Sequence, residues 1–180
     1  FSPSSRALPM IIWKEGNNMY GKRMIAFFSA SPSRRTATVA HKIADVISAD
    51  LYEIRPVIPY TEDDLDWDDK TSRVNVEMHD PACRPQIEGE LPDLAPYETI
   101  FVGFPLWWFA APHIINTFLE SYDLTGKTIV PFATSGGSSL GQTVTHLRPS
   151  AQGALVKEGR RFEMGETPMA INSWVAALGI

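Results

Sequence analysis

A short apolar run followed by a hydroxyl-rich turn limits most strongly how this chain can fold. Met24–Phe28 holds five consecutive apolar residues, which is typical of a strand buried on both faces of a parallel sheet. The turn at 29–36 supplies four hydroxyl side chains and two arginines, and apolar residues then recur at helical spacing from Ala37 to Ala49. The turn therefore predicts a phosphate site at a helix start. Taken alone, it is explained equally well as a capped helix with solvated arginines.

The alternation of apolar strands and amphipathic helices continues along the chain. Pro131 must lie near the end of its strand or at a bulge, because proline cannot donate to a sheet. Five strands alternating with helices predict an α/β fold, a doubly wound parallel sheet with helices on both faces. The other predicted strands are 50–54, 99–104, 127–133 and 154 toward 162, and the other predicted helices follow Pro112, carry Leu140 to Leu147, and run from a cap at Thr167 to Gly179.

Residues 60–97 have the least regular pattern in the chain. An amphipathic helix is predicted from about Asp68 to His79, with a cap at Asp66 or Asp68. Four prolines between Pro81 and Pro96 predict loop for the remainder.

Length and composition favour one domain. The chain has 180 residues, 44% of them hydrophobic, and can bury a single core. We expect residues 1–21 to form an N-terminal extension and residues 22–180 to form the domain. No apolar run reaches the length of a membrane span.

Charge and cysteine content restrict partner and compartment. The net charge of −5 argues against a nucleic-acid partner, which needs a basic face. An acidic cluster could steer a basic protein partner, although a solvated face is the simpler interpretation; its members are Glu62, Asp63, Asp64, Asp66, Asp68 and Asp69. A single cysteine, Cys83, fits a reducing compartment, so a cytoplasmic protein is expected, while an exported form after signal cleavage stays open.

Three chemically unusual loops follow predicted strands and should therefore open on the same edge of the sheet. Segment 29–36 offers hydroxyls, cations and amides for a phosphate. Segment 105–111 offers indole faces for a planar ring, and the Gly-rich segment 134–141 offers backbone donors for polar ring edges. A phosphate together with a stacked heterocycle describes flavin mononucleotide (FMN) better than a sugar phosphate or a metal.

Two other site classes are disfavoured. Gly137–Gly141 matches the nucleophile-elbow pattern of hydrolases, but the one histidine that follows, His146, precedes rather than follows the available acids. The four histidines are scattered and form no recognised ligand set with Cys83.

The sequence also resembles the flavodoxins, in particular their bacterial flavodoxin-like branch, over roughly residues 23–180. The residues that carry the likeness are Phe28–Ser31, Thr36, Pro105–Trp108, Ala111–Pro112, Phe118–Leu119, Tyr122–Leu124, Gly126–Lys127 and Val130–Ser138. The resemblance implies strand order 2-1-3-4-5 with the flavin between strands one and three, as in flavodoxin itself.

The resemblance also implies site residues. It assigns phosphate contact to Ser29, Ser31, Ser33 and Thr36, ring contact to Pro105, Leu106, Trp107 and Trp108, and the pyrimidine edge to Thr134, Ser135, Gly136 and Gly137. Pro32 and Ser33 replace the family's usual Gly and Asn, in a loop two residues longer that contains Arg34 and Arg35. Either arginine could clamp the phosphate.

These features predict an FMN-binding electron-transfer protein that works between a reductase and an acceptor, which is either a redox partner protein or a small molecule. The cofactor supplies the redox chemistry, so no acid–base side chain is required. A flavin-dependent NAD(P)H:quinone-type reductase is the enzyme alternative. A second alternative, which is not an enzyme, is an interaction protein that has kept the fold and lost the flavin. Oligomeric state has no sequence signal here.

Overall fold

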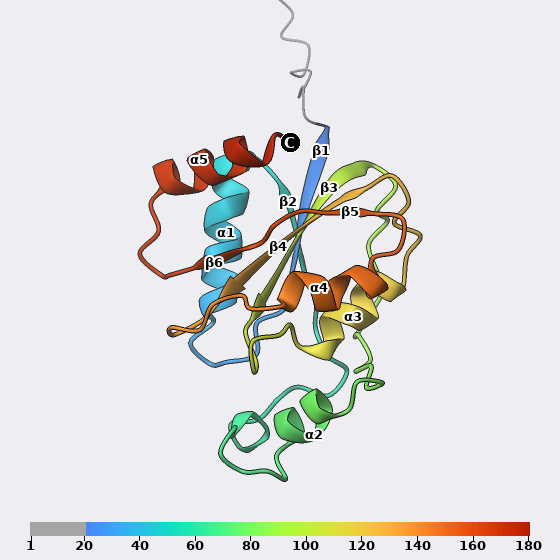
Figure 1. The fold of residues 1–180 in the computed structure, drawn as a ribbon, viewed down its shortest axis with the longest axis vertical. Helices are drawn as coiled ribbons and strands as arrows, with labels where there is room; N and C mark the ends of the chain where they lie inside the picture. The colour runs from blue at the N-terminus through green and yellow to red at the C-terminus, as the bar shows by residue number, and fades with distance from the viewer. Residues whose placement is uncertain (1–20) are drawn as a thin grey trace, which may run out of the picture.

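The sheet is the centre of the molecule. A computed structural model describes residues 21–180, so most of the predicted 1–21 extension lies outside the described residues. The strands pair in parallel in the order β2-β1-β3-β4-β5, and β6 also pairs with β4 (Figure 1). This confirms the predicted order 2-1-3-4-5. The strands are β1 (Lys22–Phe27), β2 (Asp50–Glu53), β3 (Tyr97–Pro105), β4 (Thr128–Thr134), β5 (Leu155–Val156) and β6 (Arg160–Phe162).

Helices cover both faces of the sheet, as predicted. On one face lie α1 (Arg35–Ile47) and α5 (Pro168–Leu178), and on the other lie α3 (His113–Glu120), α4 (Thr143–Leu147) and the short η2 (Arg148–Ser150) (Figure 1). Successive side chains of β1 are buried alternately on these two faces. Ile25 belongs to the hydrophobic core between the sheet and α1, and Ala26 belongs to the core between the sheet and α3. Burial on both faces explains why the strands are almost uninterrupted apolar runs.

Pro131 occupies the middle of β4 rather than its end. The carbonyls of Lys127 and Ile129 accept from the N–H groups of Leu155 and Lys157, so alternate residues of β4, including Pro131, face the outer strands. The outer partner is interrupted at this point, because β5 pairs with β4 before Pro131 and β6 pairs after it. The single fifth strand predicted from Ala154 is therefore wrong: it is two short strands, separated where proline has no N–H to offer.

The segment between β2 and β3 forms an excursion beside the carboxyl ends of the strands (Figure 1). It contains the short η1 (Asp63–Leu65) and α2 (Arg73–His79), so the predicted helix start at Asp68 is wrong. Ser72 caps α2 by accepting from the Asn75 N–H at 3.4 Å. The Asp66 carboxylate instead accepts from backbone N–H groups two and three residues later, an alternative to helix that aspartate commonly offers.

Within residues 21–180, none of the helices combines the length and the apolar character that crossing a bilayer demands.

Gly103 allows β3 and β4 to pack. A Cβ placed on Gly103 would lie 2.2 Å from the ring of Phe132, which is fully buried. We expect Gly103→Ala to lower the free energy of unfolding by about 1–3 kcal/mol through overpacking. Gly136→Ala is the matched control, because a Cβ added at Gly136 would meet nothing within 4 Å. Urea unfolding of both variants measures the difference, and equal midpoints would contradict this account of the core.

Candidate functional site

The three predicted loops meet at one rim. β1 and β3 are in register at Phe27 and Gly103, and β3 and β4 at Pro105 and Thr134. The Leu106 N–H donates to the Thr134 carbonyl at 3.0 Å. Segments 29–36, 105–111 and 134–141 therefore leave neighbouring strand ends.

A buried hydrogen bond joins the first and third of these loops. The hydroxyls of Thr36 and Thr134 lie 2.8 Å apart, and both residues are buried, with 2% and 7% of their surface exposed. This contact fixes the start of α1 against the end of β4. It also means that the Thr36 hydroxyl already has a protein partner.

The turn between β1 and α1 presents a group of unpaired donors. Within the described chain, no backbone or side-chain acceptor is bonded to the N–H groups of Ala30, Ser31, Ser33, Arg35 or Thr36. The Ser31 and Ser33 hydroxyls contact each other at 2.9 Å. Unpaired amides at a helix start, together with hydroxyls, form the donor set that an anion requires.

The two arginines of this turn have different surroundings. Arg34 has a left-handed φ of 51°, and its guanidinium contacts Glu53 at 2.6 Å and the Ser29 carbonyl at 3.2 Å. Arg35 has no ion pair within the described chain. It lines a cavity of about 250 Å³ with Thr134, Ser135, Gly136 and Arg161. Arg35, rather than Arg34, is thus the free cation beside the Gly-rich loop.

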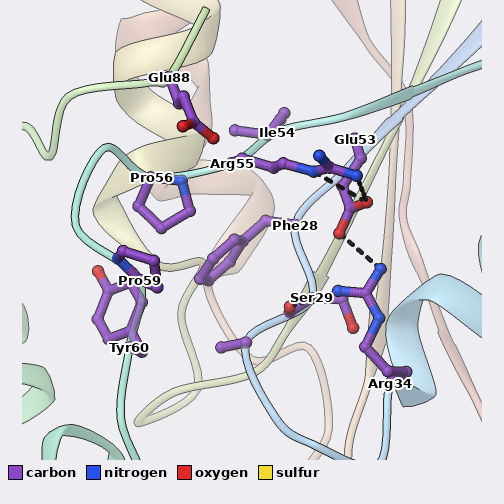
Figure 2. Close-up of a pocket in the computed structure, with 11 residues that line it drawn as sticks. Phe28, Ser29, Arg34, Glu53, Ile54, Arg55, Pro56, Pro59, Tyr60 and Glu88 are labelled. Carbon is purple, nitrogen blue, oxygen red and sulfur yellow. Dashed lines mark hydrogen bonds and ion pairs between the residues drawn. The ribbon is translucent and has the colours of Figure 1, made fainter.

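Figure 2 shows how Arg34 is held. Arg34 and Arg55 both reach the Glu53 carboxylate, at the edge of a cavity of about 350 Å³ that Ser29, Phe28 and Tyr60 also line. Burial alone would raise the pKa of Glu53, but the hydrogen bonds from the two arginines outweigh it and hold this pKa below its usual value. Glu53 was not predicted as a site residue.

The loop after β3 is a tight and strained turn. The N–H groups of Trp107 and Ala110 donate to each other's carbonyls at 3.0 Å, and the two residues between them, Trp108 and Phe109, have φ of 48° and 60°. Two successive left-handed residues define a type I′ turn, a conformation that bulky side chains seldom adopt. The Thr143 hydroxyl lies between two carbonyls, 2.9 Å from that of Phe109 and 2.5 Å from that of Leu140, and so holds the turn against the Gly-rich loop.

An aromatic cavity of about 380 Å³ joins this turn to the Gly-rich loop. Three of the predicted ring-contact residues, Leu106, Trp107 and Trp108, line it together with Ser138. Trp67 of the excursion also lines the cavity, a residue that the sequence did not single out although it is the one tryptophan within the acidic cluster.

Tyr60 connects the excursion to the rim. Its ring packs against Phe28 and Trp107, at 5.7 Å and 5.5 Å between centroids. Its hydroxyl donates to Glu77, and the Arg73 guanidinium lies 3.7 Å above its ring. Burial, reinforced by Glu77, raises the pKa of Tyr60 far above its ordinary value, so this hydroxyl remains a donor. No local sequence pattern marks such long-range contacts.

The Gly-rich loop is held by Ser135, whose hydroxyl accepts from the N–H groups of Gly137 and Ser138 at 3.2 Å and 2.9 Å. Gly136 and Gly137 are exposed and have open space where a side chain would lie. A ligand can therefore approach the backbone of these two glycines closely. Across residues 21–180, no group of three or more histidine, cysteine or acidic side chains is arranged to hold a metal ion.

Comparison with known proteins agrees with this geometry. A sequence model of the family described as flavodoxin matches residues 22–178. The chain belongs to the flavodoxin family. None of the curated proteins matches this member of the family.

Solved structures are similar over nearly the whole described domain. Proteins designated flavoproteins from Bacteroides eggerthii and Bacteroides uniformis are each 44% identical to this chain, with TM-scores of 0.83 and 0.80. The first alignment covers 89% of this chain and 99% of the other, and the second covers 87% and 98%. A flavoprotein from Lactobacillus acidophilus, solved in complex with FMN, is 22% identical with a TM-score of 0.67, covering 89% and 99%; this likeness shows the fold.

The Glu53 ion pairs predict a pH-dependent stability. Because the pKa of Glu53 is lowered in the folded state, its contribution is present above the unfolded pKa and is lost as the pH falls through the folded value. We expect Glu53→Gln to lower the unfolding free energy at pH 7 and to match the original protein at acid pH, well below the ordinary glutamate pKa of 4.5.

Glu88→Gln provides the control for this prediction, because Glu88 lines the same cavity but has no ion pair within residues 21–180. Chemical denaturation at several pH values measures both variants. If the loss of unfolding free energy in Glu53→Gln stays constant down to the lowest pH, the lowered pKa of Glu53 is not its cause.

Proposed function

We propose that this flavodoxin-family protein binds FMN at the rim and transfers electrons between a reductase and an acceptor. The observation that carries the proposal is the convergence of the three loops at Thr134, which contacts the Thr36 hydroxyl at 2.8 Å and accepts from the Leu106 N–H at 3.0 Å. The phosphate donor set belongs to the loop after β1, and the loop after β3 lines the aromatic cavity.

The donor set fits the FMN phosphate. The unpaired N–H groups of the turn and the start of α1 favour an anion, and the hydroxyls of Ser29, Ser31 and Ser33 lie in the same turn. Arg35 is the cation proposed to reach the phosphate, since Arg34 is bound to Glu53. Thr36 is proposed to contribute its backbone N–H, because its hydroxyl is already bonded to Thr134.

The aromatic cavity fits the ring. Trp107 and Trp108 supply indole surface to this cavity, with Pro105 and Leu106 leading into the turn. Thr134–Gly137 are proposed to offer backbone groups to the pyrimidine edge, although Thr134, Ser135 and Gly136 line the cavity beside Arg35 rather than the aromatic one. The bound FMN would supply the redox chemistry, accepting and donating electrons at its ring, while the protein sets burial and hydrogen bonding around it. The FMN complex of the Lactobacillus acidophilus protein supports the same cofactor for this fold.

The phosphate assignment predicts a difference between FMN and riboflavin, which lacks the phosphate. We expect the purified protein to bind FMN one to one, and Arg35→Ala to weaken FMN binding by about tenfold, the value of one charge-assisted hydrogen bond. Riboflavin affinity should not change. Fluorescence titration of the apoprotein measures both ligands.

Arg148→Ala is the matched control for Arg35→Ala, since Arg148 is exposed on the other side of the sheet at the end of α4. Equal loss of FMN and riboflavin affinity in Arg35→Ala would remove the phosphate role. A protein that binds neither flavin would favour an interaction protein on the same fold.

The carrier role predicts a specific kinetic result. We expect NADPH alone to leave the bound flavin oxidised over minutes under anaerobic conditions, because no nicotinamide-binding motif is recognised in the sequence. A catalytic amount of a flavodoxin reductase together with NADPH should bleach it. Rapid stoichiometric bleaching by NADPH alone, followed at the flavin absorption band, would assign the protein to the reductases instead.

A further inference from the structure

A second cavity is lined by Trp108 on one side and by residues of α3, α4 and η2 on the other. It has a volume of about 530 Å³, larger than the 380 Å³ of the aromatic cavity, and it lies between α3, α4 with η2, and the segment around Arg84. Trp108 lines both cavities. The strained turn therefore positions an indole that borders both cavities.

A chain of hydrogen bonds runs along one side of this second cavity. Arg84 donates to both carboxylate oxygens of Glu120, at 2.8 Å and 3.0 Å. The Ser150 hydroxyl lies 2.6 Å from Glu120 Oε1, and the Asn116 amide nitrogen lies 2.9 Å from Ser150 Oγ. All four side chains line the cavity.

This chain fixes the orientation of Asn116. Hydrogen bonds from Arg84 lower the pKa of Glu120, so the carboxylate is ionised at neutral pH and can only accept. Ser150 must then give its single hydroxyl hydrogen to Glu120, and its oxygen can only accept from Asn116. One of the two amide hydrogens is thereby committed to Ser150, and the other stays available as a donor. Asn116 Oδ1 receives no hydrogen bond from any residue between 21 and 180. This oxygen is therefore available to accept a hydrogen bond from a ligand in the cavity.

The remainder of the cavity favours an uncharged aromatic ligand. Its wall includes the Trp108 indole together with Met78, Ala111 and Leu147, surfaces on which a flat ring can pack. Arg84 and Glu120 cancel each other's charge. A mostly apolar pocket with a few oriented polar groups is the usual form of a small-molecule site.

We propose that this cavity binds a one- or two-ring aromatic compound whose hydroxyl group donates a hydrogen bond to Asn116 Oδ1. An aromatic carboxylate or ether can accept from the remaining Asn116 amide hydrogen but has no hydrogen to donate to Oδ1, so it should bind less well by one hydrogen bond. The bound ring would pack against the part of the Trp108 indole that lines this cavity. The proposal does not require flavin, so it can fail or succeed independently of the proposed function.

Calorimetry with 2-naphthol tests the site, with 2-methoxynaphthalene and 2-naphthoate as comparison ligands, in the presence and absence of FMN. We expect one mole of 2-naphthol to bind per mole of protein in both conditions, about tenfold more tightly than 2-methoxynaphthalene, the effect of one hydrogen bond. Asn116→Leu should weaken 2-naphthol by about the same factor and abolish the preference. Thr145→Trp, at the exposed edge of the cavity, should block both ligands.

Asn172→Leu is the control, because Asn172 is an exposed asparagine on α5, on the opposite face of the sheet. It should leave all affinities unchanged, and thermal unfolding verifies that each variant is folded. Absence of 2-naphthol binding, equal affinity for naphthol and its methyl ether, or affinity unaffected by both Asn116→Leu and Thr145→Trp would overturn the proposal. Displacement of 2-naphthol by FMN would also overturn it, since it would place the ligand at the rim.

Discussion

The hydrogen bond between the Thr36 and Thr134 hydroxyls is the contact on which the rim depends. A parallel sheet brings the carboxyl ends of β1, β3 and β4 together, but it does not by itself fix how the helix that follows β1 meets the loop that follows β4. The 2.8 Å contact does so. Because both hydroxyls are buried, removing one would leave the other without its partner, which costs more than the bond itself is worth.

The excursion between β2 and β3 supports this rim from outside the sheet. Tyr60 connects it to Phe28 and Trp107 through ring contacts, while Glu77 and Arg73 hold the Tyr60 side chain in place. This support matters because the neighbouring turn carries two aromatic residues in left-handed conformation, at a cost of roughly 1 kcal/mol or more each. Such conformations persist only where surrounding contacts hold them, and they are commonest at functional sites.

Local pattern predicted most of the fold. Buried strands, amphipathic helices and the Thr167–Pro168 helix start all follow short-range rules of burial and capping, whereas the strand order came from resemblance to flavodoxins. The rules failed at two places. Before α2, an aspartate side chain accepts from the backbone and forms a turn instead of starting the helix. In β4, Pro131 has no N–H to donate, and the outer partner of β4 is divided there into two strands.

The sequence predicted which loops form the candidate site, but not the contacts that arrange their side chains. The loops that meet at the rim follow from parallel topology alone, because every strand ends on the same edge. The different surroundings of Arg34 and Arg35, and the roles of Glu53 and Tyr60, depend on contacts between residues far apart in sequence or on side-chain direction, for which the sequence has no periodic signal. The same is true of the network that orients Asn116, whose members come from three segments.

The central claim is that one rim binds both the phosphate and the ring of FMN. Backbone amide chemical shifts of the ¹⁵N-labelled apoprotein, recorded as FMN is added, test it most directly. We expect the largest changes to fall together in residues 29–36, 105–109 and 134–138, and to saturate at one equivalent. Changes confined to one of these loops, changes centred on the cavity between α3 and α4, or none at all would contradict it.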